Sequence, residues 1–166
     1  MVQHSNEAAS GLTPQEVRDE NLDVTFLVWL SSRATADLLD SALAPAGLTS
    51  DEFAVYSVLT AVKTITPTEL ARWMAAPPTT VSSYVKRFQA RGHVEREPNP
   101  LDRRSYRIKL TPAGLSAHHK AATLFTPLRT RIETALGEHR EDISESLVTL
   151  RTALDGIRNS PSDGLD

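Results

Sequence analysis

Cysteine is absent from the 166-residue chain. Its absence excludes a disulfide framework, a thiolate nucleophile, cysteine-ligated zinc and cysteine-based redox sensing. Long apolar runs are missing too, since none approaches the roughly 18 residues that a membrane-spanning helix needs. The polar start, MVQHSNEAASG, lacks the basic and apolar regions of a signal peptide. We therefore expect a soluble, cytoplasmic protein with no membrane partner.

Motifs of enzymatic and metal chemistry are also missing. The sequence has no glycine-rich phosphate loop, no HExxH and no GxSxG. His118 and His119 are adjacent and do not share a helix face, which favours solvated histidines over a pair of metal ligands. We expect no enzyme, no catalytic residue, no metal and no cofactor.

The composition lacks an excess of positive charge, but one segment has it. The chain carries 18 Lys and Arg against 21 Asp and Glu, a net charge of -3. From Lys63 to Lys109, ten basic residues face four acidic ones, so this segment carries +6 and the remainder -9. Because attraction to a polyanion acts over a Debye length of about 8 to 10 Å, the local patch matters more than the overall sign. The net charge therefore does not exclude nucleic acid.

Helix starts in this sequence share one chemistry. A Thr followed by Glu three residues later, the pattern of a capping box, occurs at Thr13, Thr49 and Thr66. Thr111 precedes a proline that suits the first position of a helix. Helix stops are expected at Gly47, Gly92 and Gly156. These signals predict helices over 14–44, 50–62, 67–74 and 78–91, strands over 94–97 and 104–110, and helices over 112–136 and 138–154.

The predicted helix over 78–91 has two contrasting faces. Its apolar stripe consists of Val81, Tyr84, Val85 and Phe88. The opposite side carries Thr79, Ser83, Lys86 and Ala90, flanked by Ser82 and Arg87. Small polar and basic side chains without any acid suit a helix that enters the major groove of DNA. An ordinary solvent-exposed face is the alternative.

The predicted hairpin that follows has a basic tip. Along its second strand Tyr106, Ile108 and Leu110 point one way and Ser105, Arg107 and Lys109 the other. A narrow minor groove attracts arginine, and a two-stranded ribbon can deliver it. Asp102 is expected to pair with Arg104 and orient the arginines. The alternative is a solvated hairpin tip.

The run TELARWMAAPPTTVSSYVKRFQARGHVEREPNPLDRRSYRIKLTPAG resembles the winged helix-turn-helix of the MarR family of transcriptional regulators. The most specific element is Asn-Pro-Leu-Asp-Arg-Arg-Ser, followed by a strand and Leu-Thr-Pro-Ala-Gly. The resemblance implies that Arg104 enters the minor groove, that helix 78–91 enters the major groove, and that the first and the last two helices form a dimer. The sequence departs from the family at Pro77-Pro78, where Ser and a polar or basic residue are frequent, and at Ser83, where Arg is frequent.

We therefore predict a mainly α fold with a small β-wing, a winged helix-turn-helix in the order α-α-α-α-β-β-α-α, and a homodimer. The predicted parts are disordered tails over 1–12 and 158–166, a helical dimerisation region over 13–47 plus 111–157, and a DNA-binding domain over 48–110. The expected DNA-binding residues are Thr79, Thr80, Ser82, Ser83, Lys86, Arg87, Arg103, Arg104 and Arg107.

The predicted function is a sequence-specific regulator of transcription that binds double-stranded DNA as a dimer on a palindrome. We expect a repressor whose DNA affinity falls when a small-molecule effector binds. Such an effector could meet Phe26, Trp29, Phe53 and Tyr56, although their helical spacing also fits core packing, as does that of Trp73 with Leu70. The alternative function is a winged-helix module that binds an acidic protein and not DNA.

Overall fold

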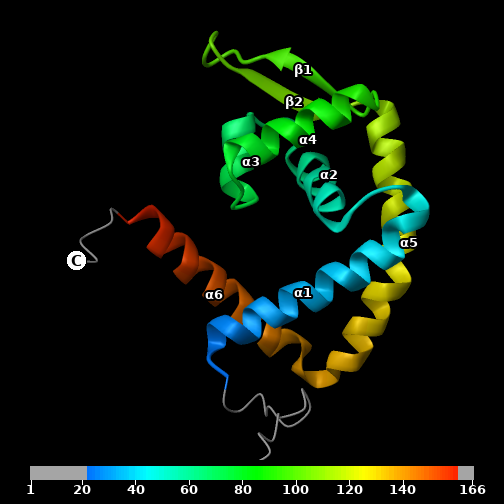
Figure 1. The fold of residues 1–166 in the computed structure, drawn as a ribbon, viewed down its shortest axis with the longest axis vertical. Coiled ribbons are helices and arrows are strands. Elements are labelled where there is room, and N and C mark those ends of the chain that lie inside the picture. Colours follow the sequence, from blue (N-terminus) through cyan, green and yellow to red (C-terminus); the bar gives the residue numbers. More distant parts are fainter. Residues whose placement is uncertain (1–21, 161–166) are drawn as a thin grey trace, which may run out of the picture. The chain divides into compact units, whose positions relative to one another are not determined.

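The computed structural model describes residues 22–160, and the predicted tail over 1–12 and the Thr13 cap lie outside this range. The helices and strands follow in the predicted order (Figure 1). They are α1 (Val24–Leu43), α2 (Ser50–Val62), α3 (Pro67–Trp73), α4 (Pro78–Ala90), β1 (Val94–Pro98), β2 (Tyr106–Leu110), α5 (Pro112–Leu136) and α6 (Arg140–Asn159). Two short 3₁₀ turns, Ala44–Ala46 and Gly137–His139, join helices. The chain divides into two units, the first ending at Leu38 and the second beginning at Leu39.

Capping boxes set the starts of α2 and α3, as predicted. The Thr49 hydroxyl accepts the amide of Glu52 at 3.2 Å, and α2 has the predicted bounds. At α3 the Thr66 hydroxyl accepts the amide of Glu69 at 3.2 Å, and the Glu69 carboxylate accepts the amide of Thr66 at 2.8 Å. These reciprocal bonds satisfy amides that a helix start leaves without partners. Thr111 caps α5 in the predicted way by accepting the amide of Gly114 at 3.1 Å.

Two predicted helix ends are wrong. The helix expected from residue 14 begins instead at Val24, because the Asp23 carboxylate accepts the amides of Thr25 at 2.8 Å and Phe26 at 3.0 Å. Asp is a strong N-cap, and that signal was missed. Gly156 does not stop the last helix, which continues to Asn159 and so into the predicted tail over 158–166. A helix interior tolerates glycine at a cost of about 1 kcal/mol.

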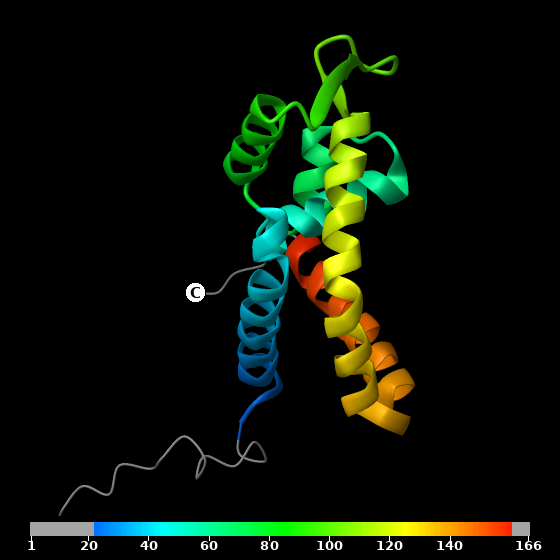
Figure 2. The same cartoon turned by 90° about the vertical axis from the view of Figure 1, so that its right-hand side faces the viewer.

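The core of the second unit lies between α2, α3, α4 and the two strands. Its fully buried side chains include Val55, Tyr56, Leu59, Leu70, Val81, Phe88 and Ile108. The strands pair antiparallel, with Val94 opposite Leu110 and Arg96 opposite Ile108. Ile65 adds a bridge to Ile108 from the loop before α3. Figure 2 shows the long helix α5 continuing directly from β2 beside this core.

The wing loop is longer than predicted. Strand β2 begins at Tyr106 and not at Arg104, because turns occupy the residues before it. The amide of Asp102 donates to the Asn99 carbonyl at 3.3 Å, and the amide of Ser105 donates to the Asp102 carbonyl at 3.0 Å. Arg104 therefore belongs to the tip of the hairpin. Gly92, with φ of 69°, ends the turn after α4 as predicted.

Two side chains have surroundings opposite to those predicted. Trp73, expected to pack with Leu70, is 57% exposed, and the Arg151 guanidinium lies 5.5 Å from its ring centre. His118, expected in solvent, is half-buried. Its ring contacts the hydroxyls of Ser57 at 3.1 Å and Thr60 at 3.3 Å, and burial lowers its pKa. His118 is a packing residue between α5 and α2.

Helix α6 presents no buried side chain, and Ile143, Leu147, Leu154 and Ile157 are exposed along it. No helix within residues 22–160 combines the length and apolar character that a bilayer span requires.

Candidate nucleic-acid interface

Helix α4 buries the predicted stripe and exposes the predicted polar face. Val81, Val85 and Phe88 have at most 1% of their surface exposed. The outward side chains are exposed, apart from the half-buried Thr80; they are Thr79, Ser82, Ser83, Lys86 and Arg87. No acidic residue occurs in this helix. The outer surface of α4 is therefore polar, basic and free of carboxylates of its own.

The start of α4 is rigid. Pro77 precedes the helix with φ of -58° and ψ of 144°, and Pro78 occupies its first turn without a side-chain cap. Proline fixes φ near -65°, so two in succession restrict how α4 leaves the turn. Within the helix the Ser83 hydroxyl donates to the Thr79 carbonyl at 3.0 Å. Its oxygen lone pairs remain able to accept a hydrogen bond.

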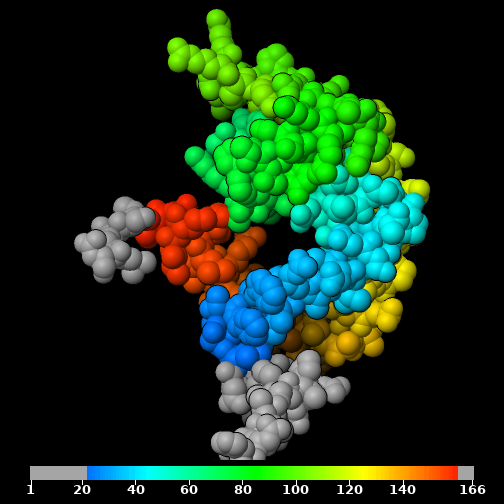
Figure 3. Space-filling view, viewed as in Figure 1, coloured from blue at the N-terminus to red at the C-terminus, as the bar shows by residue number. Residues whose placement is uncertain are grey.

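The wing tip is ordered by side chains that sequence analysis missed. Asn99, only 8% exposed, donates from Nδ2 to the Ser105 hydroxyl at 2.7 Å and accepts the Leu101 amide at 3.2 Å. Asp102 accepts the backbone amide of Arg104 at 2.9 Å, so the predicted pairing with the Arg104 guanidinium is wrong. An Asn-Pro followed by Asp is a turn signal that could have revealed this network. Arg103 and Arg104 are exposed. Figure 3 shows the yellow-green wing hairpin projecting from the surface.

Arg107 has a different environment from the one expected. Its Nε donates to the Thr64 hydroxyl, and a terminal nitrogen donates to the Thr64 carbonyl at 2.7 Å. Arg107 is half-buried and ties β2 to the loop before α3. Lys109 contacts Glu95 at 3.3 Å and Glu97 at 3.1 Å, and these hydrogen bonds raise its pKa. Both cations therefore make contacts within the protein, Arg107 with the loop before α3 and Lys109 with β1.

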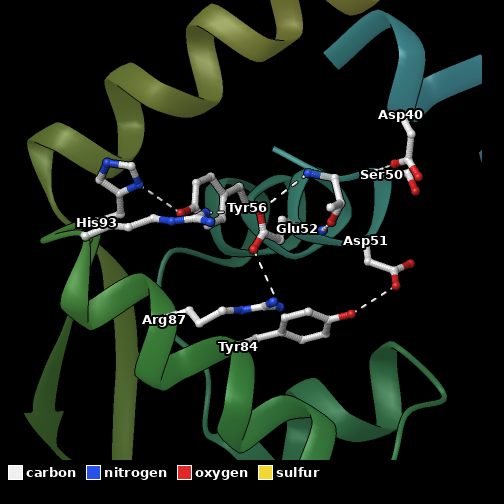
Figure 4. Close-up of polar contacts among 10 residues, drawn as sticks. Asp40, Ser50, Asp51, Glu52, Tyr56, Tyr84, Arg87 and His93 are labelled. Carbon is white, nitrogen blue, oxygen red and sulfur yellow. Dashed lines mark hydrogen bonds and ion pairs between the residues drawn. The ribbon is translucent and has the colours of Figure 1, made fainter. Parts of the chain in front are cut away.

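The first turn of α2 contacts α4 through charged side chains. We call Asp51, Glu52, Tyr84, Arg87 and Arg91 the α2–α4 clamp. Glu52 is 2% exposed and contacts Arg91 at 3.0 Å and Arg87 at 3.5 Å (Figure 4). The Tyr84 hydroxyl donates to Asp51 at 2.9 Å. The pKa of Tyr84 is raised mainly by burial and, to a smaller extent, by this hydrogen bond. Sequence analysis identified Glu52 only as part of a helix cap.

The four side chains expected to meet an effector contact other side chains of the protein. Tyr56 is fully buried, with its hydroxyl 2.9 Å from Nδ1 of His93 and its ring edge on Phe88. Phe53 packs on His118 and Phe125. Phe26 and Trp29, in the other unit, stack on each other with ring centres 5.7 Å apart. Tyr56 is therefore a core residue.

Two short helices joined by a turn, the second with a polar basic face, and a β-hairpin after them define a winged helix-turn-helix protein. Residues 46–105, from before α2 to the wing tip, match the model of the MarR family. The multiple antibiotic resistance protein MarR of Salmonella typhimurium is 31% identical over 96 residues, which are 58% of this chain and 67% of that protein. MarR of Escherichia coli matches with the same identity and coverage.

Solved structures match over most of the chain. Wild-type E. coli MarR in its apo form is 25% identical with a TM-score of 0.65, covering 77% of this chain and 95% of its own. A cysteine-to-serine variant of that protein, complexed with operator DNA, is 25% identical with a TM-score of 0.70 and coverages of 80% and 96%. Regulator MosR of M. tuberculosis in complex with DNA shares the fold, with 24% identity, a TM-score of 0.72 and coverages of 82% and 99%. The chain belongs to the MarR family, and the predicted mainly α, winged helix-turn-helix fold is confirmed.

Proposed function

We propose that this protein is a transcriptional regulator that binds double-stranded DNA in a sequence-specific manner. The observation that carries the proposal is the exposed, acid-free face of α4 beside a wing tip that presents Arg103 and Arg104. Similar structures of MarR and MosR were solved with DNA, which supports the same partner here. The alternative, a protein-interaction module, has no observation in its favour.

In this proposal α4 enters the major groove and the wing reaches the adjacent minor groove. Ser82, Ser83 and Lys86 face base edges and phosphates, where hydroxyl and ammonium groups form hydrogen bonds. Arg104 lies in the minor groove, whose negative potential is largest where it is narrow. Arg103 and Arg87 contact phosphates and make the affinity depend on salt.

The proposal includes a homodimer. Apolar side chains on α6 recur at helical spacing (Ile143, Leu147, Leu154, Ile157) and are exposed, and such a stripe is stable in water only when a partner covers it. We propose that the helical region over 13–47 plus 111–157 provides this interface. A two-fold dimer would place two α4 helices one DNA turn, about 34 Å, apart on a palindrome.

The regulator is proposed to act in the cytoplasm as a repressor. An effector that favours a dimer with a different α4 spacing would lower DNA affinity by shifting populations between the two forms. Phe26 and Trp29 of the first unit remain candidates for contacting it, and Phe53 of the second unit is a separate candidate.

Titration of duplex DNA at two salt concentrations tests the proposal against its alternative. Because phosphate contacts release counterions, we expect binding at low salt that weakens steeply as salt rises. No association at low salt would favour the protein-interaction module.

A further inference from the structure

A buried carboxylate lies directly behind the proposed DNA-reading helix. Glu52, in the first turn of α2, is 2% exposed and contacts the guanidinium groups of Arg87 in α4 (Figure 4) and of Arg91, the residue that caps the end of α4. Burying a carboxylate without a partner is strongly unfavourable. Glu52 therefore requires at least one of these arginines.

The clamp holds the two arginines unequally. Arg91 donates a hydrogen bond to Glu52 at 3.0 Å, and its side chain is 38% exposed. Arg87 contacts the other carboxylate oxygen at 3.5 Å, is 53% exposed, and lies 5.0 Å above the Tyr84 ring. The shorter bond is the stronger one. Arg91 alone can thus neutralise Glu52 when Arg87 leaves it.

Arg87 also borders the surface proposed to meet DNA. It follows Lys86 in the sequence and comes one helical turn after Ser83, on the flank of the outward face. Its guanidinium has two competing acceptors: the Glu52 carboxylate behind α4 and a DNA phosphate in front of it. Both suit a guanidinium, since each is an anion with several oxygens.

Resting on the proposed function, we propose that Glu52 competes with a DNA phosphate for Arg87 and thereby limits the affinity for DNA. In the free protein Arg87 binds Glu52. In the complex Arg87 turns to a phosphate while Arg91 stays on Glu52. Because a half-exposed ion pair contributes little, the competition lowers affinity by about two- to fivefold.

The experiment compares two substitutions that remove the same charge from neighbouring positions. Glu52→Gln keeps the size of the side chain and an acceptor for Arg91, but binds Arg87 less strongly. Asp51→Asn is the matched control, because Asp51 bonds Tyr84 and pairs with no arginine in the part of the chain that the structure describes. Affinity for a labelled duplex of mixed sequence is measured at fixed salt with the full chain. Circular dichroism establishes that each variant is folded.

Glu52→Gln is expected to tighten binding about two- to fivefold more than Asp51→Asn does. In an Arg87→Ala background the two substitutions are expected to have equal effects. Equal effects already in the presence of Arg87, or a gain that persists without it, would overturn the competition. Weaker binding by Glu52→Gln would also overturn it and leave Glu52 as a brace for α4.

A second measurement, on the wild-type protein, tests the inference even if Glu52→Gln does not fold. The Nε–H resonance of Arg87 in the wild-type protein, assigned with Arg87→Ala, is expected to shift on adding the duplex while that of Arg91 stays in place. An unmoved Arg87 resonance contradicts the inference. Wild-type protein that binds no duplex at low salt defeats the proposed function itself, whereas binding without an Arg87-dependent gain defeats only this inference.

Discussion

Basic residues of the segment from Lys63 to Lys109 have two distinct environments. Arg107 is bonded to Thr64 in the loop before α3, Lys109 pairs with Glu97 of β1, and Arg91 is bonded to Glu52. Lys86, Arg103 and Arg104 are exposed and, among the described residues, form no ion pair within 4.0 Å. Lys86 of α4 and the two arginines of the wing tip therefore keep their charge available to a polyanion.

Arg104→Ala is expected to weaken DNA binding by about 1–3 kcal/mol without changing stability, because its guanidinium forms no hydrogen bond or ion pair with any of residues 22–160. Arg107→Ala is the contrasting variant. It is expected to lower the free energy of unfolding, because it leaves Thr64 without its donor. Denaturant unfolding and DNA titration of both variants check this division. Unchanged affinity for Arg104→Ala would remove the wing from DNA binding.

Lys63 has a strained backbone. Its φ of 68° and ψ of -57° form a γ-turn, in which the amide of Thr64 donates to the Val62 carbonyl at 2.8 Å. Lys63→Gly is expected to raise the free energy of unfolding by about 1 kcal/mol, since glycine adopts positive φ without strain. Lys63→Ala removes the same charge and retains the strain. A stability gain equal for both, measured at one protein concentration, would show that strain is not the cause.

At the scale of elements, α2 connects the surfaces on its two sides. Its first turn contacts α4 through the clamp, and Ser57 and Thr60 of the same helix contact His118 of α5. A shift of α5 would therefore displace α2, and through the clamp it would also displace α4. His118 makes part of this packing sensitive to pH.

Burial lowers the pKa of His118, so the unfolded chain binds its proton more readily than the folded one. The contribution of neutral His118 to stability is complete above a pH of about 6.5 and is lost as pH falls below it. His118→Gln is expected to reduce the loss of stability between about pH 7.5 and 5.5. His119→Gln, at the exposed neighbour whose charge adds to the effect of burial on the pKa of His118, should reduce that loss by a smaller amount. The denaturation midpoint of each variant is measured across this pH range. If the midpoint of His118→Gln falls with pH as steeply as that of the wild type, His118 is not the group responsible.

An element could be predicted from the sequence when the residues that determine it lie close together in the chain. Helices α2 and α3 were predicted because a Thr and a Glu three residues apart determine their starts. The inward stripe of α4 was predicted because helical periodicity alone determines it. Glu52 and Arg107 were misjudged or missed because their partners are 39 and 43 residues away, and only the fold brings them together. Asn99 was missed for another reason: its partner is 6 residues away, and the local turn signal was not used. Trp73 follows the apolar pattern but lies at the end of a seven-residue helix, where little surrounds it.

At the scale of the whole molecule, charge is divided unevenly along the sequence, with the excess of basic residues between Lys63 and Lys109 and the excess of acidic residues in the remainder. The remainder of -9 repels DNA, while the segment of +6 attracts it. A net charge of -3 thus favours approach through α4 and the wing. Dimerisation would double this pair of elements and fix their spacing.

Leu147→Arg on α6 is expected to convert the proposed dimer to monomer, because burying an unpaired guanidinium in an apolar interface is unfavourable. Thr152→Arg adds the same charge on the opposite side of the helix and should leave the dimer intact. Sedimentation of both variants measures the oligomeric state. A dimer that survives Leu147→Arg would exclude this stripe as the interface.

The central claim is that two copies of α4 and of the wing read one operator together. Selection of bound sequences from a random pool of duplex DNA tests it most directly. The account predicts a palindrome whose half-sites are separated by about 10 base pairs, flanked by A·T-rich positions where Arg104 enters the minor groove. Recovery of unrelated sequences with no two-fold symmetry would contradict it.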